Sequence, residues 1–195
     1  MEGFAEQLNY LDHTFTLGLN GLHSAAMDQV WIFFSGVRNW FPLYALIAVL
    51  MLWKLGWKRG LTFIAACALC VVCVDQGANL VKGAVARLRP CHDPDMILAG
   101  LYLPDPGQIR SGLYGFFSAH AGNAMSFAVC SSKAFSRRRY SALYTVLIVV
   151  WALLVGVSRV FKGAHFLGDV ITGWTVGALV GLAIALIASK ICKSK

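Results

Sequence analysis

Long apolar runs constrain the fold of this chain more than any other feature of its sequence. They cover residues 40–57, 61–81, 119–133, 140–157 and 169–188. A transmembrane helix needs about 20 apolar residues, and most of these runs come close to that length. The chain is 58% hydrophobic and 13% charged, whereas a soluble domain is about 45–50% apolar and about 25% charged. The sequence therefore predicts an all-α integral membrane protein, a bundle of about five transmembrane helices.

The segments outside these runs complete a single predicted domain over residues 1–195. Residues 1–27 mix apolar and polar positions at helical spacing and are too polar to cross a bilayer, so we expect an amphipathic helix at the membrane interface. Residues 28–37 form a short apolar segment, and a bundle of six helices that counts it remains open. Residues 82–118 are rich in proline and glycine and predict a loop on the outer face.

The distribution of basic residues predicts the orientation, because short cytoplasmic loops are enriched in lysine and arginine. Ten of the 17 basic residues fall on one predicted side: Lys54, Lys58, Arg59, Lys133, Arg137, Arg138, Arg139, Lys190, Lys193 and Lys195. The other seven fall on the opposite face: Arg38, Lys82, Arg87, Arg89, Arg110, Arg159 and Lys162. That face is normally poor in positive charge, so these seven indicate an anionic ligand. Arg87 and Lys162 alone are interpreted as interfacial anchors.

Three polar clusters lie at the outer ends of the predicted spans, so they can surround one pocket. Their members are Lys82, Arg89 and Pro90; then Ser118 and His120; then Ser158, Arg159, His165 and Asp169. The three cations among them offer charge and planar donors to phosphate oxygens. Ser118 precedes a predicted helix, and its hydroxyl with the free N–H groups of Ala119 and His120 would form an anion site. The clusters therefore predict binding of a phosphoryl group.

Two histidines and one aspartate predict the chemistry of that group. His165 and Asp169 are four residues apart and so share one helical face. The carboxylate can orient the imidazole and stabilise it once charged, which makes His165 a candidate nucleophile. His120 is available as the general acid for the leaving oxygen. Because the cations can neutralise the phosphate charge, we expect neither a metal ion nor another cofactor.

The three clusters resemble the signature of the type 2 phosphatidic acid phosphatase family: K-x6-RP, then PSGH, then SR-x5-H-x3-D. The resemblance covers residues 28 to 188 in order and spacing, and the same core occurs in vanadium haloperoxidases and glucose-6-phosphatase. The second motif departs from the pattern, since Phe117 replaces proline and Ala119 replaces glycine. Alanine keeps the backbone N–H but resists a left-handed backbone, so the expected departure concerns the turn rather than the chemistry.

Asp75 is an acid within a predicted span, where a charge usually has a partner or a role. Asp75, Asn79 and Lys82 recur at i, i+4 and i+7 and so share one helical face. We hypothesise that this polar chain positions Lys82. The alternative pairs Asp75 with a polar group on another helix.

The leading hypothesis is a membrane lipid phosphatase that works through a phosphohistidine intermediate. The resemblance to bacterial members implies the inner membrane, a periplasmic active site, and undecaprenyl diphosphate or a lipid A phosphate as substrate. Phosphatidylglycerol phosphate or phosphatidate is the alternative substrate. The non-enzyme alternative is a lipid transporter or flippase, which polar residues midway through several helices would favour; here they gather at one end of the spans. We expect lipid phosphate and membrane lipids as partners, and no nucleic acid.

Overall fold

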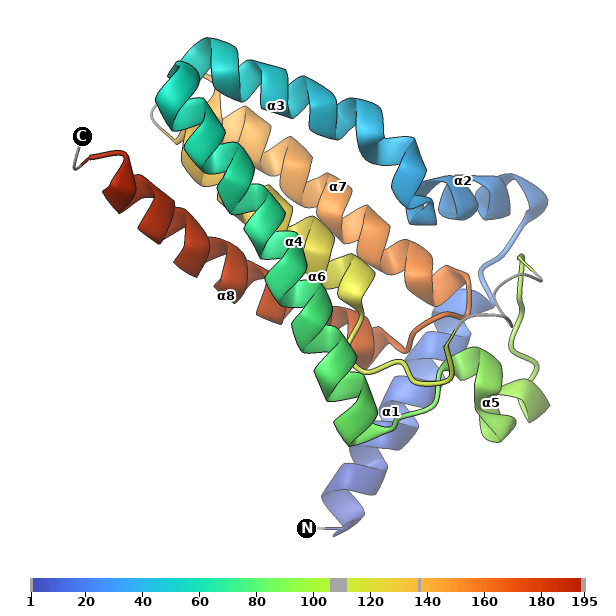
Figure 1. Cartoon of the computed structure of the whole chain (residues 1–195). Helices are drawn as coiled ribbons and strands as arrows, with labels where there is room; N and C mark the ends of the chain where they lie inside the picture. The colour runs from blue at the N-terminus through green and yellow to red at the C-terminus, as the bar shows by residue number, and fades with distance from the viewer. Residues whose placement is uncertain (1, 106–111, 137, 194–195) are drawn as a thin grey trace.

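The computed structural model of the chain describes residues 2–105, 112–136 and 138–193 (Figure 1). Arg110, Arg137 and Lys195 lie outside these residues. All regular elements in the described part are helical: α1 (Glu2–Asn20), α2 (Ala25–Ser35), η1 (Val37–Trp40), α3 (Phe41–Leu55), α4 (Trp57–Val85), η2 (Pro90–His92), α5 (Pro94–Leu98), α6 (Ala119–Phe135), α7 (Ser141–Phe161) and α8 (Leu167–Ile191).

The predicted all-α membrane fold is confirmed, with the five predicted spans corresponding to α3, α4, α6, α7 and α8. Among the described residues, α4, α7 and α8 are long and apolar enough to cross a membrane, and α2 with α3 makes a fourth candidate span bent by 70°. The short apolar segment at residues 28–37, which left a sixth helix open, thus lies in α2 and η1 and belongs to this bent pair. The remaining helix, α6, has 17 residues, most of them buried by its neighbours.

Several predicted boundaries differ from the structure by a few residues, and two of these differences change the position of an element. The single helix expected over residues 1–27 ends at Asn20, and α2 begins at Ala25 after the N-cap residue Ser24, whose side chain accepts a hydrogen bond from the Met27 N–H at 3.3 Å. The loop expected from residue 82 begins later, because α4 continues to Val85 and closes at Ala86 in a left-handed conformation. Lys82 therefore sits in the last turn of α4, where the helix geometry fixes its direction.

Helix α6 occupies the middle of the bundle, because small residues let its neighbours approach closely. Gly173, Gly177 and Gly181 repeat every four residues along α8 and face the backbone of α6. A Cβ added at Gly181 would lie 2.6 Å from the carbonyl oxygen of Ser126. Such close backbone approach drives helix association in membranes, where hydrophobic burial contributes little. The glycine repeat therefore sets how α8 presents its N-terminus to α6.

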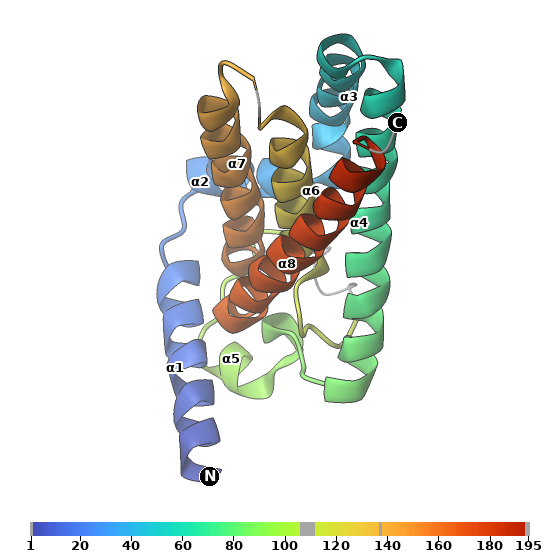
Figure 2. The ribbon, with the colours of Figure 1, turned by 90° about the vertical axis from the view of Figure 1, so that its left-hand side faces the viewer.

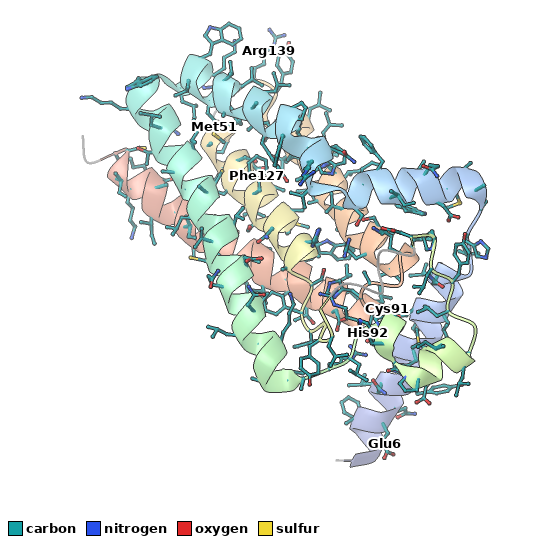
Figure 3. The ribbon with its side chains drawn as sticks, turned by 45° about the vertical axis from the view of Figure 1, so that its right-hand side comes forward. Glu6, Met51, Cys91, His92, Phe127 and Arg139 are labelled. Atoms are coloured by element: carbon teal, nitrogen blue, oxygen red, sulfur yellow. The ribbon has the colours of Figure 1, made fainter. Side chains whose placement is uncertain are left out.

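The two ends of the bundle differ in character. Figures 1 and 2 place the C-terminus, the α3–α4 turn and the α6–α7 connection at one end, with the N-terminus, α1 and α5 towards the other. Arg138 in the α6–α7 connection donates a hydrogen bond to the Lys54 carbonyl of the α3–α4 turn. Figure 3 shows Arg139 at this end, far from Cys91 and His92. Basic residues predicted to lie on one side thus share one end of the molecule.

Candidate active site

Arg89 is held in place by the chain that follows α4. A short antiparallel pairing joins residues 87–89 to residues 113–115, with Leu88 bridged to Tyr114 and Arg89 N–H bonded to the Leu113 carbonyl at 3.0 Å. The Arg89 side chain is buried and donates from Nε to the Gly112 carbonyl at 2.6 Å and from Nη1 to the Ala164 carbonyl at 3.0 Å. These bonds fix a cation against the connection between α7 and α8.

His165 lies in that connection and is 2% exposed. Its Nε2 is 3.0 Å from Nη1 of Arg89. Because the guanidinium can only donate, this contact leaves the imidazole nitrogen as the acceptor. Burial, followed by the positive charges of Arg89 and Arg159, holds the pKa of His165 well below its ordinary value. A lowered pKa favours the neutral imidazole, and its Nε2 lone pair points at the Arg89 guanidinium.

Asp169 places a fully buried carboxylate beside that imidazole. Its Oδ2 is 3.4 Å from Nδ1 of His165 and accepts a hydrogen bond from the Phe166 N–H at 3.1 Å. The distance to His165 is long for a hydrogen bond, as is common in catalytic sites without substrate. The carboxylate thus faces the ring nitrogen opposite the one that contacts Arg89, the arrangement that orients an imidazole for nucleophilic attack.

The N-terminus of α6 forms the opposite wall of the site. Ser118 is the N-cap residue of α6, and its buried Oγ accepts from the Ala121 N–H at 3.5 Å. Its N–H donates to the Asp169 carbonyl at 3.0 Å, which joins α6 to α8. Ala119 starts the helix without a left-handed backbone, since Ala86 is the non-glycine residue with positive φ in the described part of the chain. The motif's glycine is therefore not needed here for its conformational freedom.

The predicted cations gather around both imidazoles. Arg159 is buried at the end of α7, and its Nη1 donates to the Ser35 hydroxyl of α2. Lys82, Arg89 and Arg159 lie close enough to act electrostatically on His120 and His165. The structure thus brings together the residues that the sequence assigned to phosphate binding and catalysis. Within the described residues, no three His, Cys, Asp or Glu side chains group as a metal site.

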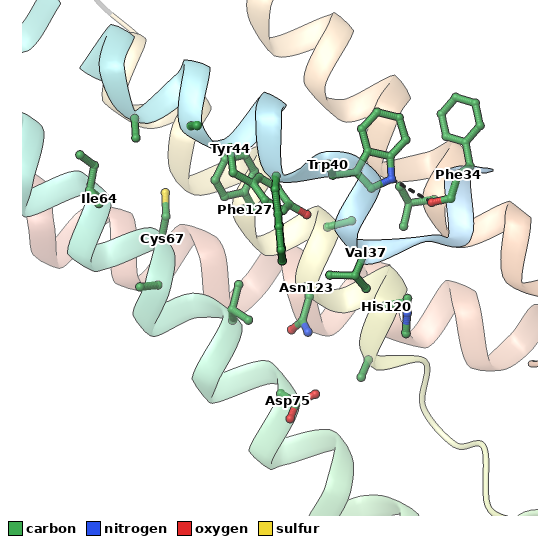
Figure 4. Close-up of a pocket in the computed structure, with 18 of the residues that line it drawn as sticks. Phe34, Val37, Trp40, Tyr44, Ile64, Cys67, Asp75, His120, Asn123 and Phe127 are labelled. Carbon is green, nitrogen blue, oxygen red and sulfur yellow. Dashed lines mark hydrogen bonds between the residues drawn. The ribbon is translucent and has the colours of Figure 1, made fainter. Parts of the chain in front are cut away.

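An apolar cavity of about 620 Å³ lies between the helices and extends to His120 at the start of α6 (Figure 4). Helices α3, α4 and α6 line it with side chains such as Tyr44, Ile64 and Phe127. Its polar members are few, and Figure 4 labels His120, Asn123 and Asp75 among them. Pockets of this kind, mostly apolar with a few convergent polar groups, are typical of ligand sites.

Asp75 makes part of the contact expected of it. Asn79 Nδ2 donates to Asp75 Oδ2 at 3.3 Å, within one face of α4. The further link from this pair to Lys82 stays a prediction. Asp75 also lines the cavity, so its side chain borders the same space as His120.

Sequence reasoning missed the role of Arg87. The side chain interpreted as an interfacial anchor instead bridges two carboxylates, with Nη1 2.9 Å from Asp169 Oδ1 and Nη2 2.7 Å from Asp12 Oδ2. Its position inside the first motif, two residues before Arg89, was the available signal. Lys162, also interpreted as an anchor, pairs with Asp105 at 2.9 Å.

A helical bundle that gathers cations around two imidazoles inside a membrane is typical of an enzyme that transfers phosphoryl groups. Residues 59–192 match the PAP2 superfamily. The chain belongs to this superfamily, since the match covers more than half of its length. The predicted family resemblance is therefore confirmed, as is the predicted enzyme class, a membrane lipid phosphatase that hydrolyses phosphoric esters.

Relatives agree with this assignment. A lipid A 4'-phosphatase of Bacteroides thetaiotaomicron is 33% identical over 187 residues, which is 95% of this chain and 80% of that protein. A lipid A 4'-phosphatase of Porphyromonas gingivalis is 32% identical over 90% of this chain and 72% of that protein. The crystal structure of a PAP2-type phosphatidylglycerolphosphate phosphatase from Bacillus subtilis has a TM-score of 0.73 at 19% identity, covering 95% of this chain and 88% of that one. This last likeness concerns the fold.

Proposed function

We propose that this protein removes a phosphate from lipid A, with the 4'-phosphate as its preferred target. The proposal rests on the position of His120, which belongs both to the apolar cavity and to the charged site. His120 lines the apolar cavity and also lies within electrostatic reach of His165 and the three cations. A lipid whose hydrocarbon enters the cavity would therefore present its phosphate to the catalytic groups. The two lipid A 4'-phosphatases similar over most of the chain support this choice of lipid.

In the first step, His165 Nε2 attacks the phosphorus of the bound phosphate. A nitrogen–phosphorus bond forms while the bond from phosphorus to the ester oxygen breaks. His120, which the negative charge of the bound phosphate keeps protonated among the cations, gives its proton to the departing oxygen. Asp169 stabilises the positive charge that develops on the His165 ring. Lys82, Arg89 and Arg159 neutralise the equatorial oxygens, together with the N–H groups at the start of α6.

In the second step, water hydrolyses the phosphohistidine. His120, now neutral, accepts a proton from the water as its oxygen attacks phosphorus. The nitrogen–phosphorus bond breaks, and inorganic phosphate leaves with His165 neutral again. Both steps use the same cations, because the phosphoryl group carries the same negative charge whether His165 or water attacks it. No step needs a metal ion.

We place the active site on the periplasmic side of a bacterial inner membrane. The basic residues of the α3–α4 turn, the α6–α7 connection and the C-terminus support a cytoplasmic location for the other end of the bundle. The catalytic groups lie at the end with fewer short basic loops. A lipid exposed on the outer leaflet of that membrane would therefore reach the cavity without crossing the bilayer.

Phosphate release from a panel of purified lipids tests the proposed substrate. The protein in detergent micelles should release phosphate from lipid A bearing a 4'-phosphate with a kcat/KM at least about 10-fold above that for lipid A phosphorylated only at position 1, undecaprenyl diphosphate, phosphatidylglycerol phosphate and phosphatidate. Release should continue at the same rate in EDTA. A preference for another lipid would overturn the lipid A assignment, and strong inhibition by EDTA would overturn the metal-free mechanism.

Filling the cavity should weaken binding of the lipid without changing the chemistry. Ala68 lines the cavity from α4, and Ala68→Phe would occupy space meant for hydrocarbon. We expect KM for the lipid substrate to rise about 10-fold, since the loss of one methylene contact in a hydrophobic pocket is worth ~1–3 kcal/mol. The rate with a short, soluble phosphate monoester should not change.

The matched control for that variant is Val72→Phe, which adds a similar side chain to the outward face of α4, where Val72 is exposed. This variant should leave both substrates unaffected. If Ala68→Phe changes neither KM nor the ratio between the lipid and the soluble ester, the cavity does not hold the lipid chain.

A further inference from the structure

Helix α1 turns a row of three polar side chains inward and leaves large apolar side chains outward. Thr16 and Asn20 are 0% and 1% exposed, and with Asp12 they repeat every four residues along one face. Phe4 and Phe15 are 69% and 58% exposed. In a membrane protein the outward apolar face can lie in lipid. The inward polar face needs partners inside the protein, because buried polar groups without hydrogen bonds are costly.

Those partners are the ends of the two helices that flank His165. Figure 2 shows α1 beside the lower parts of α7 and α8. Thr16 Oγ1 accepts from the Leu167 N–H at 3.0 Å, and Asp12 Oδ1 accepts from the Gly168 N–H at 2.8 Å. Both N–H groups belong to the first turn of α8, whose own N-cap residue, Phe166, makes no capping bond with its side chain. Helix α1 thus caps α8 from outside.

Asn20 caps the C-terminal end of α7 from outside. Its Nδ2 donates to the Phe161 carbonyl at 3.0 Å and to the Tyr102 carbonyl at 2.9 Å, and its Oδ1 accepts from the Tyr102 N–H at 2.8 Å. One polar face of α1 therefore ties together the last turn of α7 and the first turn of α8. The connection between these two turns carries His165.

Arg87 extends this contact to the buried carboxylate. One edge of its guanidinium binds Asp169 Oδ1 and the other binds Asp12 Oδ2, at 2.9 Å and 2.7 Å. Its plane lies over the Phe166 ring at 4.0 Å, which fixes its orientation further. Asp169 is 0% exposed, so its charge needs a counter-ion within the protein. With Oδ1 held by Arg87, the other oxygen, Oδ2, is left facing His165.

We propose that Arg87 and Asp12 are positioning residues for the reaction: Arg87 holds the Asp169 carboxylate in line with His165, and Asp12, supplied by α1, holds Arg87. The proposal rests on the proposed function, in which His165 is the nucleophile and Asp169 orients it. Neither residue touches the phosphate. Their effect should therefore appear in the rate of the chemical step rather than in substrate binding.

Replacement of Arg87 tests the first link. Arg87→Met removes the charge and both bridging bonds, and kcat should fall about 100-fold with KM changed less than about 3-fold, part of the loss seen when a catalytic carboxylate is removed. Arg87→Lys keeps a charge but cannot bridge two carboxylates in one plane, and should lose about 10-fold. Thermal unfolding in detergent, measured on the same preparations, separates a lost rate from a lost fold.

Replacement of Asp12 tests the second link. Asp12→Asn keeps an acceptor for the Gly168 N–H but loses the charge paired with Arg87, and kcat should fall about 10-fold. The control on the same helix is Glu6→Gln, since Glu6 is exposed near the free end of α1 (Figure 3) and should keep full activity. The double variant of Asp12→Asn with Arg87→Met should be no slower than Arg87→Met alone, because both act through one path.

Three results would overturn the inference. Variants of Arg87 and Asp12 that unfold like the wild type but keep kcat within about 2-fold would show that the bridge does not position Asp169. A rate loss that only follows the loss of folded protein would show a structural role. Additive losses in the double variant would break the link through Asp12. Failure of the proposed function is distinguishable, because the wild type and His165→Ala would then release phosphate at the same rate.

Discussion

The His165→Ala variant should release phosphate from the lipid substrate at least ~10⁴-fold more slowly than the wild type, the largest effect that we expect from any single change. The imidazole supplies the atom that attacks phosphorus, and no other side chain at that position can replace it. Phosphate release by purified protein in micelles measures the loss. Brief incubation with lipid carrying radioactive phosphate should label the wild type on an acid-labile bond and should leave the variant unlabelled.

The control is His23→Ala, which removes an exposed imidazole stacked on Tyr102 with ring centroids 3.7 Å apart. Its activity should equal that of the wild type. Substantial turnover by His165→Ala would contradict the covalent mechanism. Loss of turnover with unchanged labelling would instead place the nucleophile on a different side chain.

The Gly177→Ala variant should lower the unfolding temperature, the largest effect that we expect on stability. A Cβ at this position collides with the backbone of Gly122 on α6. Backbone cannot move aside as a flexible side chain can, so α8 must shift away from α6. Forcing extra atoms into a close-packed contact destabilises a fold by about 1–3 kcal/mol, and thermal unfolding in detergent should report it. Because the shift moves Asp169 relative to Ser118, activity should fall as well.

The matched change is Gly77→Ala on α4, where an added Cβ meets nothing within 4 Å. In a helix, alanine is favoured over glycine by about 0.5–1 kcal/mol, so this variant should keep or raise the unfolding temperature. Opposite signs for the two substitutions would support close packing of α8 on α6. Equal stabilisation by both would contradict it.

The sequence by itself determined the membrane class and pointed to the residues that we propose for catalysis. Apolar runs near the length of a bilayer require helices, because every backbone polar group in lipid must be satisfied within the chain. The spacing of His165 and Asp169 predicted that the two side chains would meet, and they do, at 3.4 Å. The expected shared helical face was wrong, because His165 lies in the connection before α8 begins at Leu167. Such spacings are local signals, carried by residues within a few positions of one another. They needed no knowledge of how the helices pack.

The ends of the helices were harder to predict, because local signals do not determine them. The extension of α4 to Val85 and the break between α1 and α2 depend on which polar groups find partners in three dimensions. The predicted contact between Asp75 and Asn79 is local to α4, and the structure contains it as a hydrogen bond. The interpretation of Arg87 as an interfacial anchor failed, because its two partners lie 75 and 82 residues away along the chain.

Only the tertiary structure decided how the catalytic pair is supported. The polar face of α1 could be recognised as Asp12, Thr16 and Asn20, but nothing in that pattern says that it caps α8 and α7. The cavity that includes His120 likewise depends on several helices at once, with residues of α2, α3, α4, α6 and α7 in its lining. Spacing along one helix fixes which residues share a face, whereas the partner of that face depends on the approach of another helix. In this chain the glycine repeat on α8 and the polar face of α1 set that approach.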